Sequence, residues 1–498
     1  MSKKDELEKL RAQIDHIDDK LLSLFEERMR TAKKIADYKK ENKIEVVNKE
    51  REKEVVTRLS EKVPQELAGY VQKLYKTLFE LSRDYQNGLI FQKKYGLIGR
   101  NINYSFSKDI HGYFADYDYS IINLEPEQLE GFFDSKEYAG FNVTIPYKKD
   151  ACQLCDSISP KAERIGCVNT VIACPDGTFR GDNTDYDGFL YLSKRAGVDF
   201  NGKKVLVFGN GATSSTVCTV VKDLGGIITV ISRTGENNYS NLSNFFDAEI
   251  IINTTPVGTY PETANQITDL KKFPKCEAVL DVVYNPLKSR LVQQAESLGM
   301  KASGGLPMLV AQGKRACELF TGVPIDDSKT EQVIQKVWHQ KQNIVLVGMP
   351  GCGKSTIAEL LAKELGREVI DTDAEIVKME GKQIPQIFAE FGEPYFRAKE
   401  SLVISTVAKK SGIIIATGGG SVLSDTNRQN LGQNGYFVFL ERDINSLSTK
   451  DRPLSKDIET LNKMYTERLP YYKSIADLVV SNDGKPETAA DKIAEVFK

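Results

Sequence analysis

A glycine-rich phosphate-binding loop is the feature that most constrains the fold of this chain. Residues 348–356 read GMPGCGKST and directly follow the apolar run NIVLV, with a helical pattern after them. A complete G-x-x-x-x-G-K-[ST] pattern between a strand and a helix predicts an α/β sheet that binds phosphate at the helix N-terminus. Lys354 would then reach the β and γ phosphates, and Ser355 would supply an oxygen to magnesium. A turn that merely connects two elements is the alternative, which we weigh at about one in twenty.

Carboxylates and arginines after this loop indicate what accepts the phosphoryl group. Asp371 and Asp373 end the next apolar run, where the ligands of open parallel sheets gather. One carboxylate can serve magnesium while the other deprotonates a hydroxyl, although both could simply cap the following helix. Arginine is well shaped to grip a carboxylate at two points, so the spaced arginines predict a small acidic acceptor.

Residues 342–498 resemble shikimate kinase in the P-loop, D-T-D, F-R-x-x-E, G-G-G, R-P and R-x-x-x-Y motifs. The resemblance implies that Asp373 is catalytic with Lys354, and that Ser355 and Asp371 bind Mg²⁺. It implies that shikimate is bound by Arg397, Gly418, Gly419, Gly420 and Arg468. ATP would be bound by Gly348, Gly351, Cys352, Gly353, Lys354, Ser355, Thr356 and, from a short lid, Arg452.

The middle of the chain contains a second nucleotide-binding pattern. The run KVLVFG leads into Gly209 and Gly211, two of the three glycines of a dinucleotide-binding turn. Arg233 follows the next strand-like run in place of an acidic residue, and arginine there accommodates the 2′-phosphate of NADP. The alternative for Arg233 is a solvated cation at a strand end.

Residues 93–338 resemble shikimate dehydrogenase. The resemblance rests on the motifs S-F-S, N-V-T-I-P-Y-K, G-D-N-T-D, D-V-V-Y-N-P and G-L-P-M-L-V-A-Q. The resemblance implies NADPH-dependent reduction of 3-dehydroshikimate to shikimate, with Lys148 and Asp185 as the catalytic pair. Without that context Lys148 would be a solvated surface lysine. Substrate would be bound by Ser105, Ser107, Thr144, Asn169 and Gln312. NADP would be bound by Gly209, Asn210, Gly211, Ala212, Ser232, Arg233, Thr234, Tyr284 and Gly305.

The first 86 residues have a helical pattern with an apolar seam, which comprises Leu7, Leu10, Ile14, Ile17, Leu21, Leu24, Ile35 and Tyr38. The heptad count places Arg28 on this seam, where a guanidinium is costly unless an anion meets it. Lys39 projects within about 20° of Arg28, whereas Arg11 points about 100° away, toward a site on a partner chain. A helix over residues 5–40 would extend about 54 Å, so we expect an intertwined homodimer.

This module resembles the all-helical chorismate mutases, which rearrange chorismate to prephenate. The resemblance implies that Arg28, Lys39, Glu52 and Gln86 act in catalysis and that Arg11, Arg51 and Ser82 bind substrate. The alternatives are a charged coiled-coil dimerisation arm and a catalytically silent effector sensor, which would leave a bifunctional dehydrogenase and kinase. We weigh catalysis at about six in ten against these two.

Composition narrows the class of protein. Lys and Arg total 67 and Asp and Glu 69, so no overall field favours nucleic acid or an anionic membrane. Because no membrane span or signal peptide is recognisable, we expect a cytoplasmic protein with eight reduced cysteines, most of them in cores. The expected fold is multidomain: an all-α module at 1–90, a Rossmann-type α/β dehydrogenase at 93–338 and an α/β P-loop kinase at 342–498. The substrate part of the dehydrogenase is expected at about 93–190 and the NADP part at about 191–305.

Overall fold

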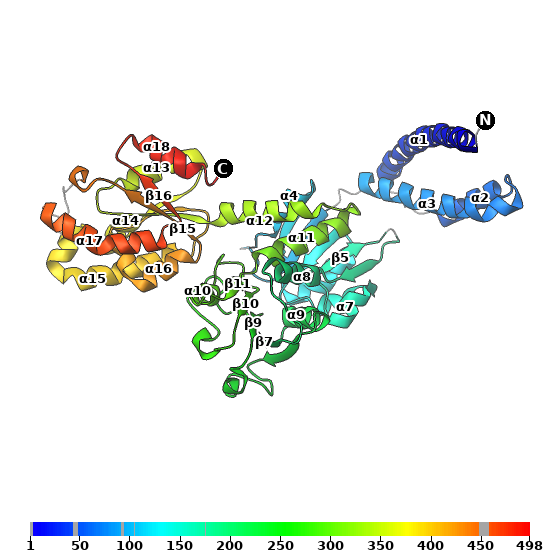
Figure 1. Ribbon diagram of the computed structural model, residues 1–498. Coiled ribbons are helices and arrows are strands. Elements are labelled where there is room, and N and C mark those ends of the chain that lie inside the picture. Colours follow the sequence, from blue (N-terminus) through cyan, green and yellow to red (C-terminus); the bar gives the residue numbers. More distant parts are fainter. Residues whose placement is uncertain (1–2, 43–47, 91–93, 104, 175, 448–457) are drawn as a thin grey trace. The chain divides into compact units, whose positions relative to one another are not determined.

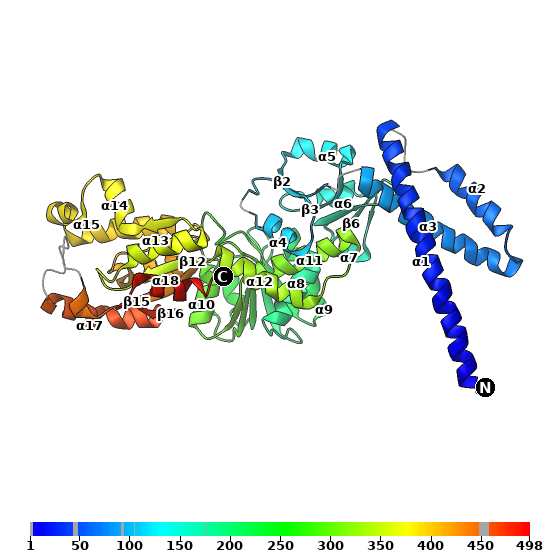
Figure 2. The same ribbon diagram turned by 90° about the horizontal axis from the view of Figure 1, so that it is seen from above.

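The structure is a computed structural model that describes residues 3–42, 48–90, 94–103, 105–174, 176–447 and 458–498. Figures 1 and 2 show the helices and strands, coloured along the sequence. The chain divides into two compact units. One unit comprises Met1–Lys108, Asp116–Ser159 and Val168–Asp182, and the other comprises Asp109–Ala115, Pro160–Cys167 and Asn183–Lys498. Every helix among the described residues is too short or too polar to span a bilayer.

The N-terminal module has three helices, α1 (Lys3–Asn42), α2 (Lys49–Ser60) and α3 (Gln65–Ile90). Figure 2 shows α1 as one long helix, and it packs on α3 through the buried Ala32 and Ala36. The predicted seam is not covered by the described part of the chain, since all eight of its apolar side chains are exposed, by 44 to 62%. The helical prediction is confirmed, and the seam remains a large apolar face.

A six-stranded mixed sheet follows, in the order β2-β1-β3-β5-β6-β4. Its first three strands pair in parallel, whereas β5 is antiparallel to both β3 and β6. The strands are β1 (Lys94–Gly99), β2 (Tyr119–Asn123), β3 (Tyr138–Val143), β4 (Ser157–Ile158), β5 (Thr170–Ala173) and β6 (Phe179–Asp182). The helices of this region are α4 (Ser107–Phe114), α5 (Leu129–Ser135), α6 (Asp150–Leu154) and α7 (Pro160–Ile165).

A second, fully parallel sheet has the order β11-β10-β9-β7-β8. Its strands are β7 (Lys204–Phe208), β8 (Ile227–Ile231), β9 (Ile250–Asn253), β10 (Ala278–Asp281) and β11 (Lys301–Ser303), and its helices are α8 (Asp185–Arg195), α9 (Ala212–Asp223), α10 (Arg290–Ser297) and α11 (Leu306–Thr321). The strand order reverses between β7 and β9, and ligands of such sheets bind at that reversal. The predicted dinucleotide turn at Gly209 and Gly211 lies there, directly after β7.

The C-terminal sheet is also parallel, in the order β13-β14-β12-β15-β16. Its strands are β12 (Asn343–Val347), β13 (Val369–Asp371), β14 (Ile414–Ala416), β15 (Gly435–Glu441) and β16 (Leu478–Ser481). Its helices are α13 (Lys354–Leu365), α14 (Thr372–Glu380), α15 (Ile384–Val407), α16 (Asp425–Gly432), α17 (Ile458–Ile475) and α18 (Pro486–Ala494), and α12 (Asp327–Lys341) precedes it. Every residue of β12 is buried, which explains its uninterrupted apolar run.

The multidomain fold class is confirmed by these elements and by the family matches given below. One detail of the prediction is wrong. Only four of the eight cysteines are buried, Cys167, Cys276, Cys317 and Cys352, while the other four are partly exposed. Small thiols fit the edges of these domains as well as their cores.

Candidate active sites

In the helical module, Arg28 is held against α3. Its guanidinium donates to the Leu78 carbonyl over 3.1 Å, bonds the Ser82 hydroxyl and lies 5.8 Å from the centre of the Phe79 ring. Partial burial lowers the pKa of Arg28 from its usual value. The structure therefore brings together two predicted site residues, Arg28 and Ser82, in a half-buried setting where an anion would relieve the cost of burying the charge.

The remaining predicted mutase residues divide into two groups. Gln86 is only 8% exposed, and its Oε1 has no hydrogen-bond partner among the described residues. Lys39 is half-buried on α1. Arg11 and Arg51 instead lie on exposed surfaces, bonded to Glu8 and Glu54 over 2.9 and 2.7 Å. In the described chain these two arginines do not join Arg28.

In the mixed sheet, the substrate residues expected for a dehydrogenase lie on the loops after β1 and β3 and before β5. The hydroxyls of Ser105 and Ser107 are 3.0 Å apart, so the S-F-S turn presents both on one side. Asn169 is 3% exposed and accepts a hydrogen bond from Thr170 over 3.1 Å. Thr144 follows β3 and is half-buried, and Lys148, four residues later, is only 8% exposed. Burial of a lysine to this extent is unusual and marks Lys148 as more than a solvated cation.

The dinucleotide turn has the geometry of a phosphate cradle. Gly209 has φ of 113°, and a Cβ there would lie 2.6 Å from the Thr254 hydroxyl, so only glycine fits. A Cβ on Gly211 would meet nothing within 4 Å, which leaves open space at the N-terminus of α9. These residues fit a bound dinucleotide phosphate. Ser232 is buried after β8, while Arg233 and Thr234 are exposed and free to face a ligand.

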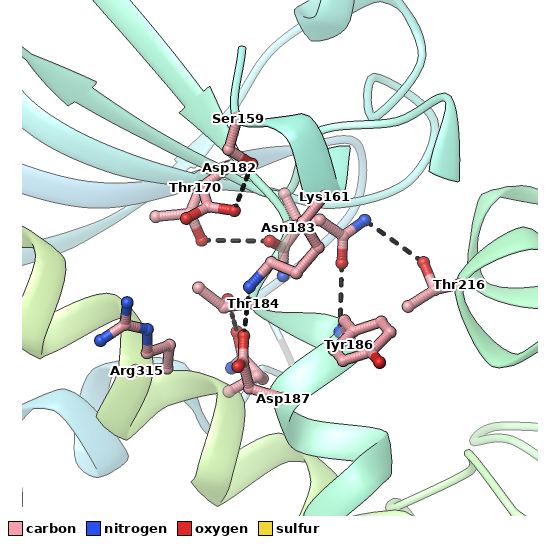
Figure 3. Close-up of polar contacts among 12 residues, drawn as sticks. Ser159, Lys161, Thr170, Asp182, Asn183, Thr184, Tyr186, Asp187, Thr216 and Arg315 are labelled. Carbon is pink, nitrogen blue, oxygen red and sulfur yellow. Dashed lines mark hydrogen bonds and ion pairs between the residues drawn. The ribbon is translucent and has the colours of Figure 1, made fainter. Parts of the chain in front are cut away.

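Asp185 begins α8 and is 7% exposed. The preceding Thr184 donates to the Gln312 side chain over 3.4 Å, so Gln312 contacts the residue directly before Asp185. Asn183, which had no predicted role, is fully buried, and its amide donates to the Cys167 carbonyl. The amide also donates to Thr216, and its oxygen accepts the Tyr186 N–H (Figure 3). Asn183 thereby fixes the start of the helix that carries Asp185. Lys148 and Asp185 belong to different compact units, so their pairing stays a prediction.

In the C-terminal domain, the glycine-rich loop follows β12. Gly348, Gly351 and Gly353 all have positive φ, as the tight loop requires, and Cys352 is buried within it. The Lys354 ammonium donates to the carbonyls of Gly348 and Met349 over 2.9 and 3.0 Å. The Ser355 hydroxyl donates to Asp371 over 2.7 Å, which places two oxygens of the kind that Mg²⁺ prefers side by side. Asp371 also caps α14, so the capping alternative is confirmed for this residue alongside the possible metal role.

The acceptor side of this site is a cluster of buried charges. Asp373 Oδ1 has no hydrogen-bond partner among the described residues, and burial, with the charges of Asp371 and Glu400, raises the pKa of Asp373 to about 6. A Cβ on Gly418 would lie 2.7 Å from both Asp373 and Glu400, so the glycine lets the strand end approach these carboxylates. A carboxyl poised near neutrality in such a site is suited to general-base chemistry.

Arginines complete the acceptor side. A Cβ on Gly420 would collide with the Arg397 guanidinium, and Gly419 is equally tight against Pro350. Arg468 is 5% exposed, and its Nε lacks a hydrogen-bond partner within the described chain. Arg452 lies outside the described residues. Glu400, which the sequence reasoning assigned no role, is 1% exposed and bonds Arg397 and Ser421.

Comparison with known proteins finds a family for each of these three regions of the chain. Family models match residues 10–87 (chorismate mutase type II), 97–171 (shikimate dehydrogenase substrate binding domain) and 350–498 (shikimate kinase). The shikimate dehydrogenase (NADP(+)) of Clostridium perfringens strain SM101 is 33% identical over 267 residues, which cover 49% of this chain and 98% of the relative. The enzyme of the same name from Methanosarcina acetivorans is 35% identical over 263 residues, which cover 47% of this chain and 94% of the relative.

Among solved structures, a chorismate mutase/shikimate 5-dehydrogenase fusion protein from Clostridium acetobutylicum has 30% identity and a TM-score of 0.48, covering 49% of this chain and 97% of its own. The identity over nearly the whole length of the dehydrogenase relatives is decisive. The chain therefore belongs to the shikimate dehydrogenase family and is a multifunctional shikimate-pathway enzyme that also carries type II chorismate mutase and shikimate kinase domains.

Proposed function

We propose that the chain reduces 3-dehydroshikimate with NADPH, phosphorylates shikimate with ATP and rearranges chorismate to prephenate. The observation that carries this proposal is that one chain contains two regions with related matches. One matches shikimate dehydrogenase over nearly the full length of that enzyme, and the other matches shikimate kinase. The product of the first reaction is the substrate of the second. We assign the activities to residues 1–90 (mutase), 93–338 (dehydrogenase) and 342–498 (kinase), with the substrate part of the dehydrogenase at about 93–190 and its NADP part at about 191–305.

In the dehydrogenase, Ser105 and Ser107 hold the substrate carboxylate, and its hydroxyls are held by Thr144, Asn169 and Gln312. NADPH supplies the hydride when bound. Lys148 donates a proton to the oxygen of the reduced carbonyl, and Asp185 orients that lysine. The burial of both charged side chains supports these roles, since water is excluded from them. The cofactor is held by Gly209, Asn210, Gly211, Ala212, Ser232, Arg233, Thr234, Tyr284 and Gly305.

In the kinase, Asp373 accepts the proton of the attacking hydroxyl, while Arg397, Arg468 and residues 418–420 hold the acidic acceptor. The loop around Lys354 holds the phosphates of ATP, and Arg452 also binds ATP. Ser355 and Asp371 hold Mg²⁺, which neutralises phosphate charge when bound. The raised pKa of Asp373 supports its role as base.

In the mutase, no nucleophile is needed. Arg28, together with Arg11 of a second copy, holds the substrate carboxylates. Arg51 and Ser82 also bind substrate, and Lys39 and Gln86 face the oxygen of the breaking ether bond. Glu52 accepts a hydrogen bond from the ring hydroxyl. The exposed seam of α1 supports a homodimer, because a second copy would cover it and bring Arg11 to the site. The second candidate function, a non-catalytic dimerisation or sensing module, is favoured by the exposed ion pair of Arg11.

One panel of assays on the purified full-length chain tests this proposal. It is given 3-dehydroshikimate with NADPH, shikimate with ATP and Mg²⁺, and chorismate alone, and turnover is expected in all three. Turnover in only the first two would favour the non-catalytic module.

We also propose a cytoplasmic location, which imaging of the tagged full-length protein checks.

A further inference from the structure

An ion pair that the sequence did not suggest joins α2 to α3 in the helical module. The Arg83 Nη1 lies 2.6 and 2.7 Å from the two carboxylate oxygens of Glu52. The two side chains are 19% and 26% exposed, and the residues are 31 positions apart in the chain. The contact is therefore tertiary and partly shielded from solvent, where an ion pair is screened less than at the surface.

Arg83 immediately follows Ser82, which bonds Arg28, and it lies one helical turn before the buried Gln86. Arg83 thus lies on the same helix as Ser82 and Gln86, and close to both of them in sequence. Glu52 and Arg83 also line a cavity of about 400 Å³, together with Lys49, Lys53 and Lys76. Among the described residues, Arg83 is the lining cation that forms an ion pair with Glu52.

The geometry leaves Glu52 able to bind a further group. A carboxylate has about four lone-pair sites on its two oxygens, and Arg83 approaches both oxygens with a single nitrogen. A substrate hydroxyl can therefore still donate to Glu52. The ion pair fixes the orientation of the flexible Glu52 side chain before substrate binds. Without it, the conformational freedom of this side chain would be lost on substrate binding, and that loss would weaken binding.

We propose that Arg83 is a positioning residue of the mutase: it holds the Glu52 carboxylate in the orientation that accepts the ring hydroxyl of the substrate. This inference rests on the proposed mutase function. Arg83 acts through Glu52 and does not itself touch the reacting atoms. A purely structural ion pair, which would only clamp α2 to α3, is the competing explanation.

A double-mutant cycle on the full-length chain separates the two. Arg83→Leu is expected to lower kcat/KM for chorismate about tenfold or more, whereas in a Glu52→Gln background the same change alters it less than about twofold. Arg83→Lys keeps the charge and should recover part of the loss. Arg58→Leu, an exposed arginine on α2, is the matched control, and dehydrogenase turnover in each sample reports intact protein.

An equal loss of kcat/KM from Arg83→Leu with and without Glu52 would overturn the positioning role. A loss of kcat/KM that is accompanied by a lowered melting temperature of the helical module would also overturn it, since a purely structural clamp predicts both together. So would wild-type activity of Arg83→Leu. If Arg83→Leu does not fold, Arg83→Lys replaces it in the same cycle. A wild-type chain that leaves chorismate unchanged would remove the mutase function itself, and with it this inference.

Discussion

The buried carboxylate of Glu400 binds Arg397 through a 2.9 Å contact between Oε2 and Nη1, while its other oxygen accepts the Ser421 hydroxyl over 2.7 Å. Glu400 is 1% exposed, and it links the arginine proposed to hold shikimate to Ser421, directly after residues 418–420. The kinase thus has a buried support beneath its proposed acceptor site.

Replacing Glu400 by Gln should weaken shikimate binding, because Arg397 loses the charged partner that orients it. We expect the KM for shikimate to rise about tenfold, which corresponds to roughly 1.4 kcal/mol, with a smaller change in kcat. Glu393→Gln is the matched control, since Glu393 also contacts Arg397, over 3.0 Å, but from an exposed position. Equal effects of the two variants would show that the buried contact has no special role.

The pH dependence of the kinase should report Asp373. Its pKa is raised to about 6, and only the ionised carboxylate can accept a proton from the acceptor hydroxyl. Below pH 6 the kcat/KM for shikimate should therefore fall about tenfold per pH unit, and above it the profile should level off. Asp373→Asn should lose activity by at least about a hundredfold at every pH. A wild-type profile that is flat from pH 5 to 7 would rule out this base.

Asp281 should make the dehydrogenase less stable as pH rises. A carboxylate held in a surface ion pair has the opposite effect. Asp281 is fully buried, and burial raises its pKa from 3.8 to about 7. Hydrogen bonds from Ser289, Val283 and Asn253 lower the pKa but do not offset the effect of burial. Between about pH 4 and 7 the unfolded chain ionises this group while the folded chain keeps it neutral. The free energy of unfolding should therefore fall as pH rises, by up to about 4 kcal/mol in total.

Calorimetry of wild type and Asp281→Asn at pH 4.5, 6 and 8 measures this effect. The melting temperature of the dehydrogenase in the wild type, minus that in Asp281→Asn, should decrease as pH rises. This difference should level off above pH 7. A difference that does not change with pH would contradict the prediction.

Arg233 should select NADPH over NADH if it meets the 2′-phosphate. Arg233→Ser should raise the KM for NADPH about tenfold or more and leave that for NADH unchanged, because only NADPH carries the extra phosphate. Lys222→Ser, an exposed cation near the far end of α9, provides the control. An unchanged preference for NADPH would make Arg233 a solvated strand-end residue.

The exposed seam of α1 should hold the dimer together. Ile17→Glu with Leu21→Glu places charge on two residues that are 50% and 56% exposed in the single chain. We expect a monomer by sedimentation, loss of mutase turnover and an unchanged kinase. Val323→Glu, at a 60% exposed apolar position outside the seam, should leave the assembly intact. Retention of the dimer in the double variant would place the interface elsewhere.

The elements that could be predicted from sequence are those with a strong local pattern. The runs of β7, β9, β10 and β12 are apolar because nearly all their residues are buried in parallel sheets. The strands β5 and β6 were not predicted, since each has four residues and mixed polarity and is specified by antiparallel partners.

The same distinction applies to the sites. The phosphate loop and the seam position of Arg28 follow from spacing alone. The contacts of Asn183 with Thr216, of Glu400 with Ser421 and of Arg83 with Glu52 join residues that are distant in sequence, so no local pattern indicates these contacts. Such supporting contacts become visible only once the elements are packed.

The most direct test of the central claim is a single reaction that contains the full-length protein, 3-dehydroshikimate, ATP and Mg²⁺, with and without NADPH. We predict that ADP forms only when NADPH is present and that it does not exceed the NADPH oxidised, because the kinase acts on the product of the dehydrogenase. Asp185→Asn should abolish both signals, and added shikimate should restore ADP formation alone. ADP formation that is independent of NADPH, or NADPH oxidation that never yields ADP even with added shikimate, would contradict the account.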